Sequence, residues 1–415
     1  MRLNVVQNVV CLTLISFTTS QQIASDPGLS GGPLEVIHLY NDLFPQGIAV
    51  SSTGRKFSNY ARSLDPNNIA YTVAELVSNN TEQAYPSAEI NSPPGGAINY
   101  TTTPPSGANY PNYLIGVQSV VIDPKDRLWI LDTGRAATPE GVNVPSTPGG
   151  PKLIGIDLRN DTIFQTILFP PTVAYSDSYL NDIRFDLRPS VTASGKGIAY
   201  ITDASQEGRN GIVMVDLGTG ESWRHLDNTP EVRATRGFVP FIWGEAVYSL
   251  PPGPGQPITF AGNFGADGIA LSADGATLFW AAVGSRTLYS IPTERLRDRS
   301  PTSEIQAQAS VVSRGEKGIS DGLETDSNGL IYTGNFEDNA INVFNPANGT
   351  VQVFARDPRI AWTDTFAVAT DGYVYFTENQ FWRTKAYYPG TDRRVKPYVL
   401  FRAKCPGNGT KVNLQ

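Results

Sequence analysis

The chain has 415 residues, 40% of them hydrophobic, and a formal net charge of −7. This acidic balance, with no cluster of Lys and Arg, argues against a nucleic-acid partner, which requires a phosphate-binding surface. The 39 glycines and 31 prolines, with few long amphipathic patterns, indicate an all-β protein rich in turns.

The N-terminus has the layout of a secretory signal peptide over residues 1–20. Met1 and Arg2 precede an apolar run over residues 9–17, and small polar residues follow it. The run is too short to span a membrane, so no membrane anchor is expected. We expect one domain over residues 21–415, secreted or held in a secretory-pathway lumen or vacuole.

Two further features bear on this destination. Cleavage would remove Cys11 and leave Cys405 without an internal disulfide partner, and the sequence does not predict a role for Cys405. Five sequons for N-glycosylation fit secretion, at Asn79, Asn99, Asn160, Asn348 and Asn408.

A repeated pattern organises the rest of the chain. Each copy opens with a polar residue, continues as a short alternating strand and ends in a turn before a second strand. Six copies occur, beginning near residues 45, 117, 181, 266, 320 and 363. They predict a six-bladed β-propeller of four-stranded antiparallel blades around a central channel, in which residues 34–40 pair with the last blade.

The polar residues that open the copies start the innermost strands, so ring closure would bring them to one mouth of the channel. They are Gln46, Gln118, Asp182, Asp267, Asp321 and Asp364, with Asn181 beside them. The alternative is that each is a turn residue bonded to its own backbone. Loops after the second strands return to the same face and add Arg135, Arg286, Asn335, Phe336, Glu378 and Asn379.

Two segments are candidate covers for this mouth. Residues 85–113 are dense in Pro, Gly, Asn and Tyr with no strand or helix pattern, so Tyr110 and Tyr113 are candidate ligand contacts, unless this is an idle surface loop. Trp243 is a second candidate aromatic. The clearest helix pattern covers residues 292–298, and His38 and His225 are expected to be packing residues.

Several segments resemble the major royal jelly protein/Yellow family. They include GVQSVVID at 116–123, RLWILDTG at 127–134, AYITD at 199–203, GIALS at 268–272, SRTLY at 285–289, SDG at 320–322 and NAI at 339–341. The resemblance covers roughly residues 35–404 and implies a secreted six-bladed propeller. The paired cysteines of insect members are missing, which points to a non-insect branch, with a filamentous-fungal one expected.

Three functions remain open. The sequence has no nucleophile elbow, zinc motif, P-loop or dinucleotide fingerprint, so the expected partner is a small molecule and no redox cofactor is expected. The resemblance extends to fungal hetero-Diels-Alderases, which join a tropolone quinone methide to a terpene olefin. In that reading the catalytic residues are Asp182, Asp321, Arg135 and Arg286.

The first alternative is a calcium-dependent lactonase like the related gluconolactonase propellers. Carboxylate and amide oxygens are suitable calcium ligands, and the candidates are Asn181, Asp267, Asp321 and Asp364. The second alternative is a binding or storage protein without catalysis.

Overall fold

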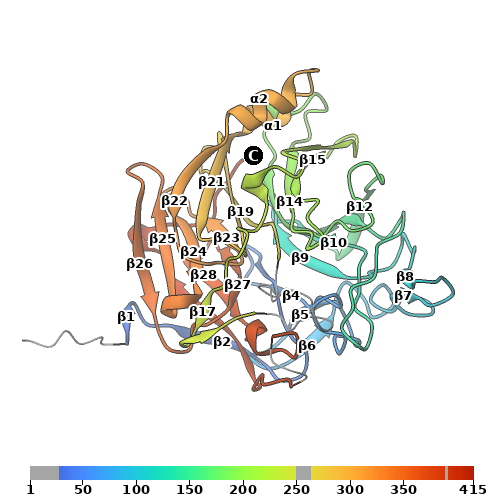
Figure 1. Cartoon of the computed structure of the whole chain (residues 1–415), viewed down its shortest axis with the longest axis horizontal. Helices are drawn as coiled ribbons and strands as arrows, with labels where there is room; N and C mark the ends of the chain where they lie inside the picture. Colours follow the sequence, from blue (N-terminus) through green and yellow to red (C-terminus); the bar gives the residue numbers. More distant parts are fainter. Residues whose placement is uncertain (1–27, 249–262, 388–390) are drawn as a thin grey trace, which may run out of the picture.

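The computed structural model describes residues 28–248, 263–387 and 391–415, so the expected signal peptide lies outside the described residues. Six four-stranded antiparallel sheets are arranged radially, as predicted (Figure 1). Each innermost strand contacts the innermost strands of the two neighbouring blades. The ring is therefore closed.

The strands of the first three blades follow one another along the chain. Blade 1 consists of β3 (Ile48–Val50), β4 (Lys56–Asn59), β5 (Val73–Leu76) and β6 (Glu82–Ala84). Blade 2 consists of β9 (Val117–Ile122), β10 (Leu128–Asp132), β11 (Lys152–Asp157) and β12 (Thr162–Leu168). Blade 3 consists of β13 (Leu180–Asp186), β14 (Ile198–Asp203), β15 (Gly211–Asp216) and β16 (Ser222–His225).

The other three blades complete the ring. Blade 4 consists of β19 (Ala266–Leu271), β20 (Thr277–Ala282), β21 (Thr287–Pro292) and β22 (Val312–Glu316). Blade 5 consists of β23 (Leu323–Thr325), β24 (Ile331–Asn335), β25 (Ala340–Asn345) and β26 (Thr350–Arg356), with β1 (Ser30–Gly31) added outside. Blade 6 consists of β27 (Thr363–Val368), β28 (Tyr373–Glu378), β29 (Tyr398–Lys404) and β2 (Glu35–Tyr40).

The two ends of the chain meet in blade 6. Strand β2 pairs antiparallel with β29, which confirms the predicted closure. His38 on β2 is buried, and its ring nitrogens lie 2.8 Å from the Ser78 carbonyl oxygen and 2.8 Å from a Glu82 carboxylate oxygen. Because Glu82 belongs to blade 1, this contact joins the last blade to the first.

Apolar side chains fill the spaces between blades. Trp129 of blade 2 stacks on Phe185 of blade 3 with ring centroids 5.3 Å apart, and Phe279 of blade 4 meets Phe344 of blade 5 at 6.3 Å. A single blade has no partner for these faces, so the stacking of neighbours supplies the core.

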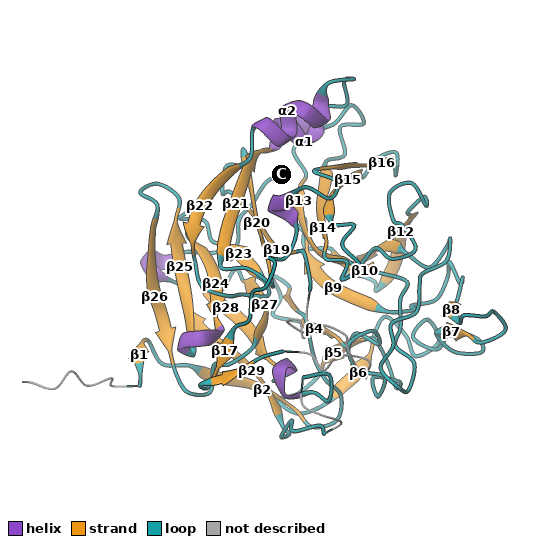
Figure 2. Cartoon of the chain, viewed as in Figure 1, coloured by secondary structure: helices purple, strands orange, loops and turns teal. Residues whose placement is uncertain are grey.

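Helices and small hairpins lie outside the blades (Figure 2). The predicted helix is α1 (Thr293–Arg297), and α2 (Ser303–Ala309) follows it. His225 is buried, and its ring nitrogens lie 2.8 Å from Glu304 of α2 and from the Asp298 carbonyl oxygen. Within the described ranges, no helix has the length and apolar character needed to span a membrane.

The segment over residues 85–113 contains one hairpin that the sequence did not predict. It consists of β7 (Ile98–Asn99) and β8 (Ser106–Gly107). Its two-residue strands are too short to show an alternating pattern. A second small hairpin, β17 (Phe241–Ile242) and β18 (Glu245–Ala246), precedes blade 4.

Replacement of His38 tests whether this residue is structural. His38→Ala should lower the free energy of unfolding by about 2–3 kcal/mol, because it leaves Glu82 buried without its partner. Urea unfolding followed by tryptophan fluorescence measures the change. An unchanged unfolding free energy together with lost catalysis would instead make His38 a functional residue.

Candidate functional site

Six polar side chains lie where the inner strands begin, as the repeat predicts. Five of them are buried, and Asp321 is partly exposed. The set is Gln46, Gln118, Asp182, Asp267, Asp321 and Asp364. Their contacts divide them into a group of three carboxyls and a group of separately bonded side chains.

Glycines bring three of the carboxyls together. Gly268 follows Asp267, and a Cβ at this position would collide with the Asp321 carbonyl oxygen of the next blade. Gly322 follows Asp321, and its N–H donates to the Asp364 carbonyl oxygen at 2.6 Å, where a Cβ would also collide. The Asp-Gly pairs therefore allow three neighbouring inner strands to approach closely at the level of their aspartates.

Irregular strand pairing places two of these aspartates. The register of β19 against β20 shifts between Ala266 and Ile269, and that of β27 against β28 shifts between Thr363 and Phe366. Bulges of this kind redirect side chains at the rims of closed sheets. Asp267 and Asp364 lie within these shifts.

Asp267, Asp321 and Asp364 form what we call the axial carboxyl cluster. The Asp267 and Asp321 side chains lie close enough for each to shift the pKa of the other. Amide and indole groups donate to the remaining oxygens: Asn181 Nδ2 to Asp267 at 2.6 Å, Trp362 Nε1 to Asp321 at 2.7 Å and Asn379 Nδ2 to Asp364 at 2.6 Å.

Burial makes these carboxyls weak acids. It raises the pKa of Asp267 to about 8, and the Asp364 and Asp182 charges add to this effect while the hydrogen bond to Asp321 opposes it. Burial, followed by repulsion from Asp267, raises the pKa of Asp321 well above its ordinary value. Burial and the Asp321 charge do the same to the pKa of Asp364. The cluster therefore retains protons at neutral pH.

The other ring residues have separate partners. Asp182 accepts from Arg184 Nη1 at 2.9 Å and from Ser119 Oγ at 3.0 Å. Gln118 Oε1 accepts from the Tyr179 hydroxyl at 2.7 Å. Gln46 Oε1 accepts from the Ala61 N–H, whereas its buried Nε2 has no hydrogen-bond partner.

Lys317 is a buried basic residue that the sequence did not predict as part of the site. It lies in the loop between β22 and β23, and its side chain faces Asp321 and Asp267. Burial lowers its pKa to about 7, although the two carboxylates oppose the shift. One sequence feature could have identified Lys317. It lies four residues before Asp321, in a loop that leads to the same end of the channel.

Aromatic rings pack beside the cluster. Trp362, which donates to Asp321, stacks on Phe336 with centroids 4.6 Å apart and meets Phe381 edge-on at 5.2 Å. Tyr387 lies 5.4 Å from Phe381, and Phe264 lies 6.3 Å from it. We call these five residues the aromatic cover. Phe336 is the member that the sequence analysis named.

The other predicted rim residues differ in their distance from the cluster. Asn379 bonds to it directly. Glu378 accepts hydrogen bonds from the backbone N–H groups of Ala361 and Trp362 at 2.9 and 3.0 Å. Burial raises the pKa of Glu378 to about 8. Asn335 Nδ2 donates to Asp338 at 2.7 Å.

The two predicted arginines are already paired with carboxylates. Arg135 bonds to Glu207 at 2.7 Å, and Arg286 bonds to both oxygens of Glu337 at 2.6 and 2.7 Å. The Arg286 guanidinium also lies 4.7 Å from the centre of the Phe238 ring. These contacts occupy the groups that the sequence analysis assigned to the substrate.

The predicted lid aromatics contact other residues. Tyr110 and Tyr113 meet each other edge-on at 5.8 Å within the long loop. Trp243 occupies the turn between β17 and β18, is 53% exposed, and lies 5.5 Å from Trp382. Trp382 is adjacent to Phe381, so Trp243 lies near the aromatic cover.

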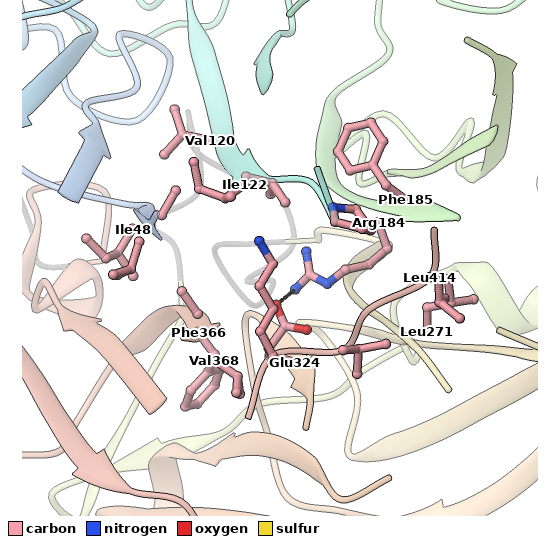
Figure 3. Close-up of a pocket in the computed structure, with 17 residues that line it drawn as sticks. Ile48, Val120, Ile122, Arg184, Phe185, Leu271, Glu324, Phe366, Val368 and Leu414 are labelled. Atoms are coloured by element: carbon pink, nitrogen blue, oxygen red, sulfur yellow. Dashed lines mark ion pairs between the residues drawn. The ribbon is translucent and has the colours of Figure 1, made fainter. Parts of the chain in front are cut away.

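The C-terminal residues lie against the opposite ends of the inner strands. The Leu187 N–H donates to the Leu414 carbonyl oxygen at 2.8 Å, and Lys411 Nζ donates to the Asp123 carbonyl oxygen at 2.9 Å. A cavity of about 70 Å³ remains beneath them (Figure 3). Arg184 lines it and lies 3.4 Å from Glu324, so Arg184 links this cavity to Asp182.

The sequence analysis also considered the axial residues as calcium ligands. Among the described residues, no three His, Cys, Asp or Glu side chains are placed to hold a metal ion. Asn181 and Asn379 direct amide N–H groups, not oxygens, at the carboxyls.

The closed ring and its axial carboxyls define a six-bladed propeller with a polar centre. The chain belongs to the major royal jelly protein family, because the model of that family, described as major royal jelly protein, matches residues 115–404. This confirms the resemblance noted in the sequence. No curated protein sequence matches the chain significantly.

Solved structures share the fold at low sequence identity. Regucalcin from Agrobacterium tumefaciens, described as a calcium-binding protein, has a TM-score of 0.50 and 13% identity over 92% of this chain and 95% of that chain. A luciferin-regenerating enzyme has a TM-score of 0.50 and 10% identity, over 92% of this chain and 97% of that one. These similarities concern the fold alone.

The raised pKa of Asp267 predicts a pH-dependent stability. The folded state holds its proton up to about pH 8 and the unfolded state only to about pH 4, so this group's stabilising contribution is lost as pH rises between these values. Asp267→Asn should therefore gain stability relative to the wild type between pH 5 and 8. Urea unfolding at both values measures this, with Glu294→Gln, an exposed residue of α1, as control. A pH-independent difference would contradict a protonated Asp267.

Proposed function

We propose that this propeller is a cofactor-independent enzyme that cyclises or joins small organic molecules, with a hetero-Diels-Alder reaction of a tropolone-type substrate and a terpene olefin as the specific reaction. The observation that carries the proposal is the close approach of the inner strands at Gly268 and Gly322, which crowds the Asp267 and Asp321 carboxyls beside Trp362 and raises the pKa of both. A buried carboxyl that keeps its proton at neutral pH is a general acid.

The reaction begins with loss of water from a ring that carries a hydroxyl and an adjacent hydroxymethyl group. The Asp267–Asp321 pair donates its proton to the hydroxymethyl oxygen, the C–O bond breaks and water leaves. Loss of the ring hydroxyl proton then gives a neutral quinone methide. The olefin adds to it with one new C–C and one new C–O bond and no change in overall oxidation state.

The aromatic cover favours such reactants. Trp362 and Phe336 are buried rings stacked on each other, so the surroundings of the acid are apolar and aromatic, which suits a planar ring and a hydrocarbon. Holding both reactants in register lowers the barrier by as much as about 7–11 kcal/mol without a nucleophile or a redox group. Trp362 connects the acid to the aromatic cover. Its indole N–H donates to Asp321, and its ring stacks on Phe336.

A direct assay tests this proposal. A hydroxymethyl tropolone and a cyclic sesquiterpene olefin are incubated with the protein, and the adduct is measured by chiral chromatography with mass detection. We expect one enantiomer in excess, formed at a rate that falls by about 10²–10⁴-fold in Asp321→Asn. Asp371→Asn, a carboxylate in an exposed turn, is the control and should keep the wild-type rate.

The assay also separates the alternatives. The proposal expects the rate to survive exhaustive chelation. Loss of rate that added calcium restores would favour a calcium-dependent enzyme, such as a lactonase. Tight binding of both compounds with no adduct above the buffer rate would favour a binding protein.

We also propose that the protein passes through the secretory pathway, on the basis of the N-terminal pattern and the sequons. Asn160 and Asn348 are exposed in turns, and each Oδ1 accepts from the hydroxyl of its sequon threonine, Thr162 at 2.7 Å and Thr350 at 2.8 Å. Expression in a eukaryotic secretory host should therefore give glycans at both sites and a mature start near Gln21. Intact mass before and after deglycosylation checks this, and an unmodified chain that retains Met1 would contradict it.

A further inference from the structure

A second cavity lies outside the axial site and has a volume of about 400 Å³. Its walls come from the β4–β5 loop, from the segment over residues 85–113 and from the loop that follows β10. The β7–β8 hairpin of that segment lies at the periphery of the ring (Figure 1). The lining contains no member of the axial carboxyl cluster or the aromatic cover. The volume falls within the range of small-molecule sites, about 300–1,000 Å³.

Most of the lining is apolar. Ile69 of the β4–β5 loop is 77% exposed and Tyr100 of the long segment is 60% exposed, so two large apolar side chains border the cavity without a protein partner that covers them. Ala97, Ala136 and Ala137 line it with small side chains. An organic molecule with an apolar body would bury these surfaces, which is favourable.

Arg62 is the charged residue of the lining. Its side chain is buried, and its guanidinium donates to four backbone carbonyl oxygens. Nε donates to Asn68 at 3.2 Å, Nη1 donates to Leu114 and Ile115 at 3.0 and 3.2 Å, and Nη2 donates to Asn91 at 2.6 Å. These bonds use four of the five guanidinium N–H groups. One N–H group of Nη2 is left for a ligand.

No carboxylate of the described residues forms an ion pair with this guanidinium, and the lining contains no acidic residue. Asp65, three residues along the chain, pairs with Arg394 at 2.6 Å, and Asp132 pairs with Lys152 at 3.3 Å. Burial lowers the pKa of Arg62 to about 10, so the group keeps its charge at neutral pH. A buried charge without a counter-ion is unfavourable, and an anion in the cavity would relieve this cost.

The other polar side chain of the lining with several contacts is already occupied. Asn91 Oδ1 accepts from the backbone N–H groups of Thr72 and Val73 at 2.9 and 3.0 Å. Asn91 Nδ2 donates to the carbonyl oxygens of Tyr85 and Ser87 at 3.0 and 2.9 Å. Recognition of a ligand's polar group therefore depends on Arg62.

We propose that this cavity is a binding site for a small amphiphilic carboxylate, an organic acid whose carboxylate meets Arg62 and whose apolar body lies between Ile69 and Tyr100. The charge of the lining selects an anion, and its apolar surface selects a hydrocarbon or aromatic body. Arginine suits this role because its guanidinium binds carboxylates with directed, charge-assisted hydrogen bonds. The site is separate from the axial one and does not depend on the proposed function.

Two probes of the same shape test the charge preference. The full chain is titrated with 2-naphthoate and with neutral 2-naphthamide, and binding is measured by calorimetry at neutral pH. We expect naphthoate to bind at least tenfold more tightly, because a hydrogen bond to a charged group contributes more than a neutral one. Equal affinities, or no naphthoate binding at about 1 mM, would overturn the proposal.

Substitutions at the rim locate the bound probe. Ile69→Asp should weaken naphthoate binding about two- to fivefold, because it adds a negative charge beside the anion, whereas the isosteric Ile69→Asn should weaken it less. Both changes are at a largely exposed position and are expected to fold. Equal effects of Ile69→Asp and Ile69→Asn would contradict an anion at this place.

Two further variants complete the test. Ala97→Trp should fill the cavity from a half-buried position and abolish binding of both probes. Arg62→Gln should remove the preference for naphthoate over naphthamide. Since Arg62 also holds three parts of the chain together, the Ile69 variants decide the matter if Arg62→Gln fails to fold. Unchanged naphthoate binding in folded Ala97→Trp would overturn the proposal.

The cycloaddition assay separates this site from the axial one. Ala97→Trp should keep the wild-type rate while it loses naphthoate binding. A carboxylate site with no cycloadduct in the wild type would support this inference and reject the proposed reaction. Loss of the cycloaddition rate together with naphthoate binding in folded Ala97→Trp would contradict a separate site.

Discussion

The close approach of neighbouring inner strands is the constraint on which the axial site depends. Gly268 and Gly322 permit backbone contacts that any side chain would block, and the aspartates before them are consequently crowded and largely shielded from water. Charge on all three carboxyls would cost both desolvation and mutual repulsion, so they bind protons. The close approach of the inner strands therefore both closes the propeller and raises the pKa values of the axial carboxyls.

Two buried ion pairs of the described residues show how buried charge is commonly neutralised. Asp203 meets Arg224 at 2.7 Å and Asp132 meets Lys152 at 3.3 Å. The axial carboxyl cluster instead consists of three acids, and the ion pairs of the described residues include none for them. Such an arrangement does little for stability, because buried unpaired charge is unfavourable. Strongly shifted groups that share one location are a sign of function.

The repeat was sufficient to predict the blades, their number and the closing strand, because alternation and turn residues are local properties of the sequence. The starts of the inner strands could be located for the same reason. Lys317, Phe381 and Tyr387 were missed, since they lie in loops whose course depends on packing against other blades. The pairing of Arg135 with Glu207 was likewise hidden, because 72 residues separate them and no local pattern links the two.

The pairing of β2 with β29 also sets the order of folding. Glu35 and Arg402, which form an ion pair across this seam at 2.7 Å, are 367 residues apart. Strand β2 is synthesised early, and the backbone N–H and C=O groups of its edge therefore lack their β29 partners until almost the whole chain has been synthesised. A nascent chain held at any earlier length would expose that edge to other chains. Closure of the ring is thus a late step, and its efficiency depends on how long the edge of β2 stays protected from other chains during translation.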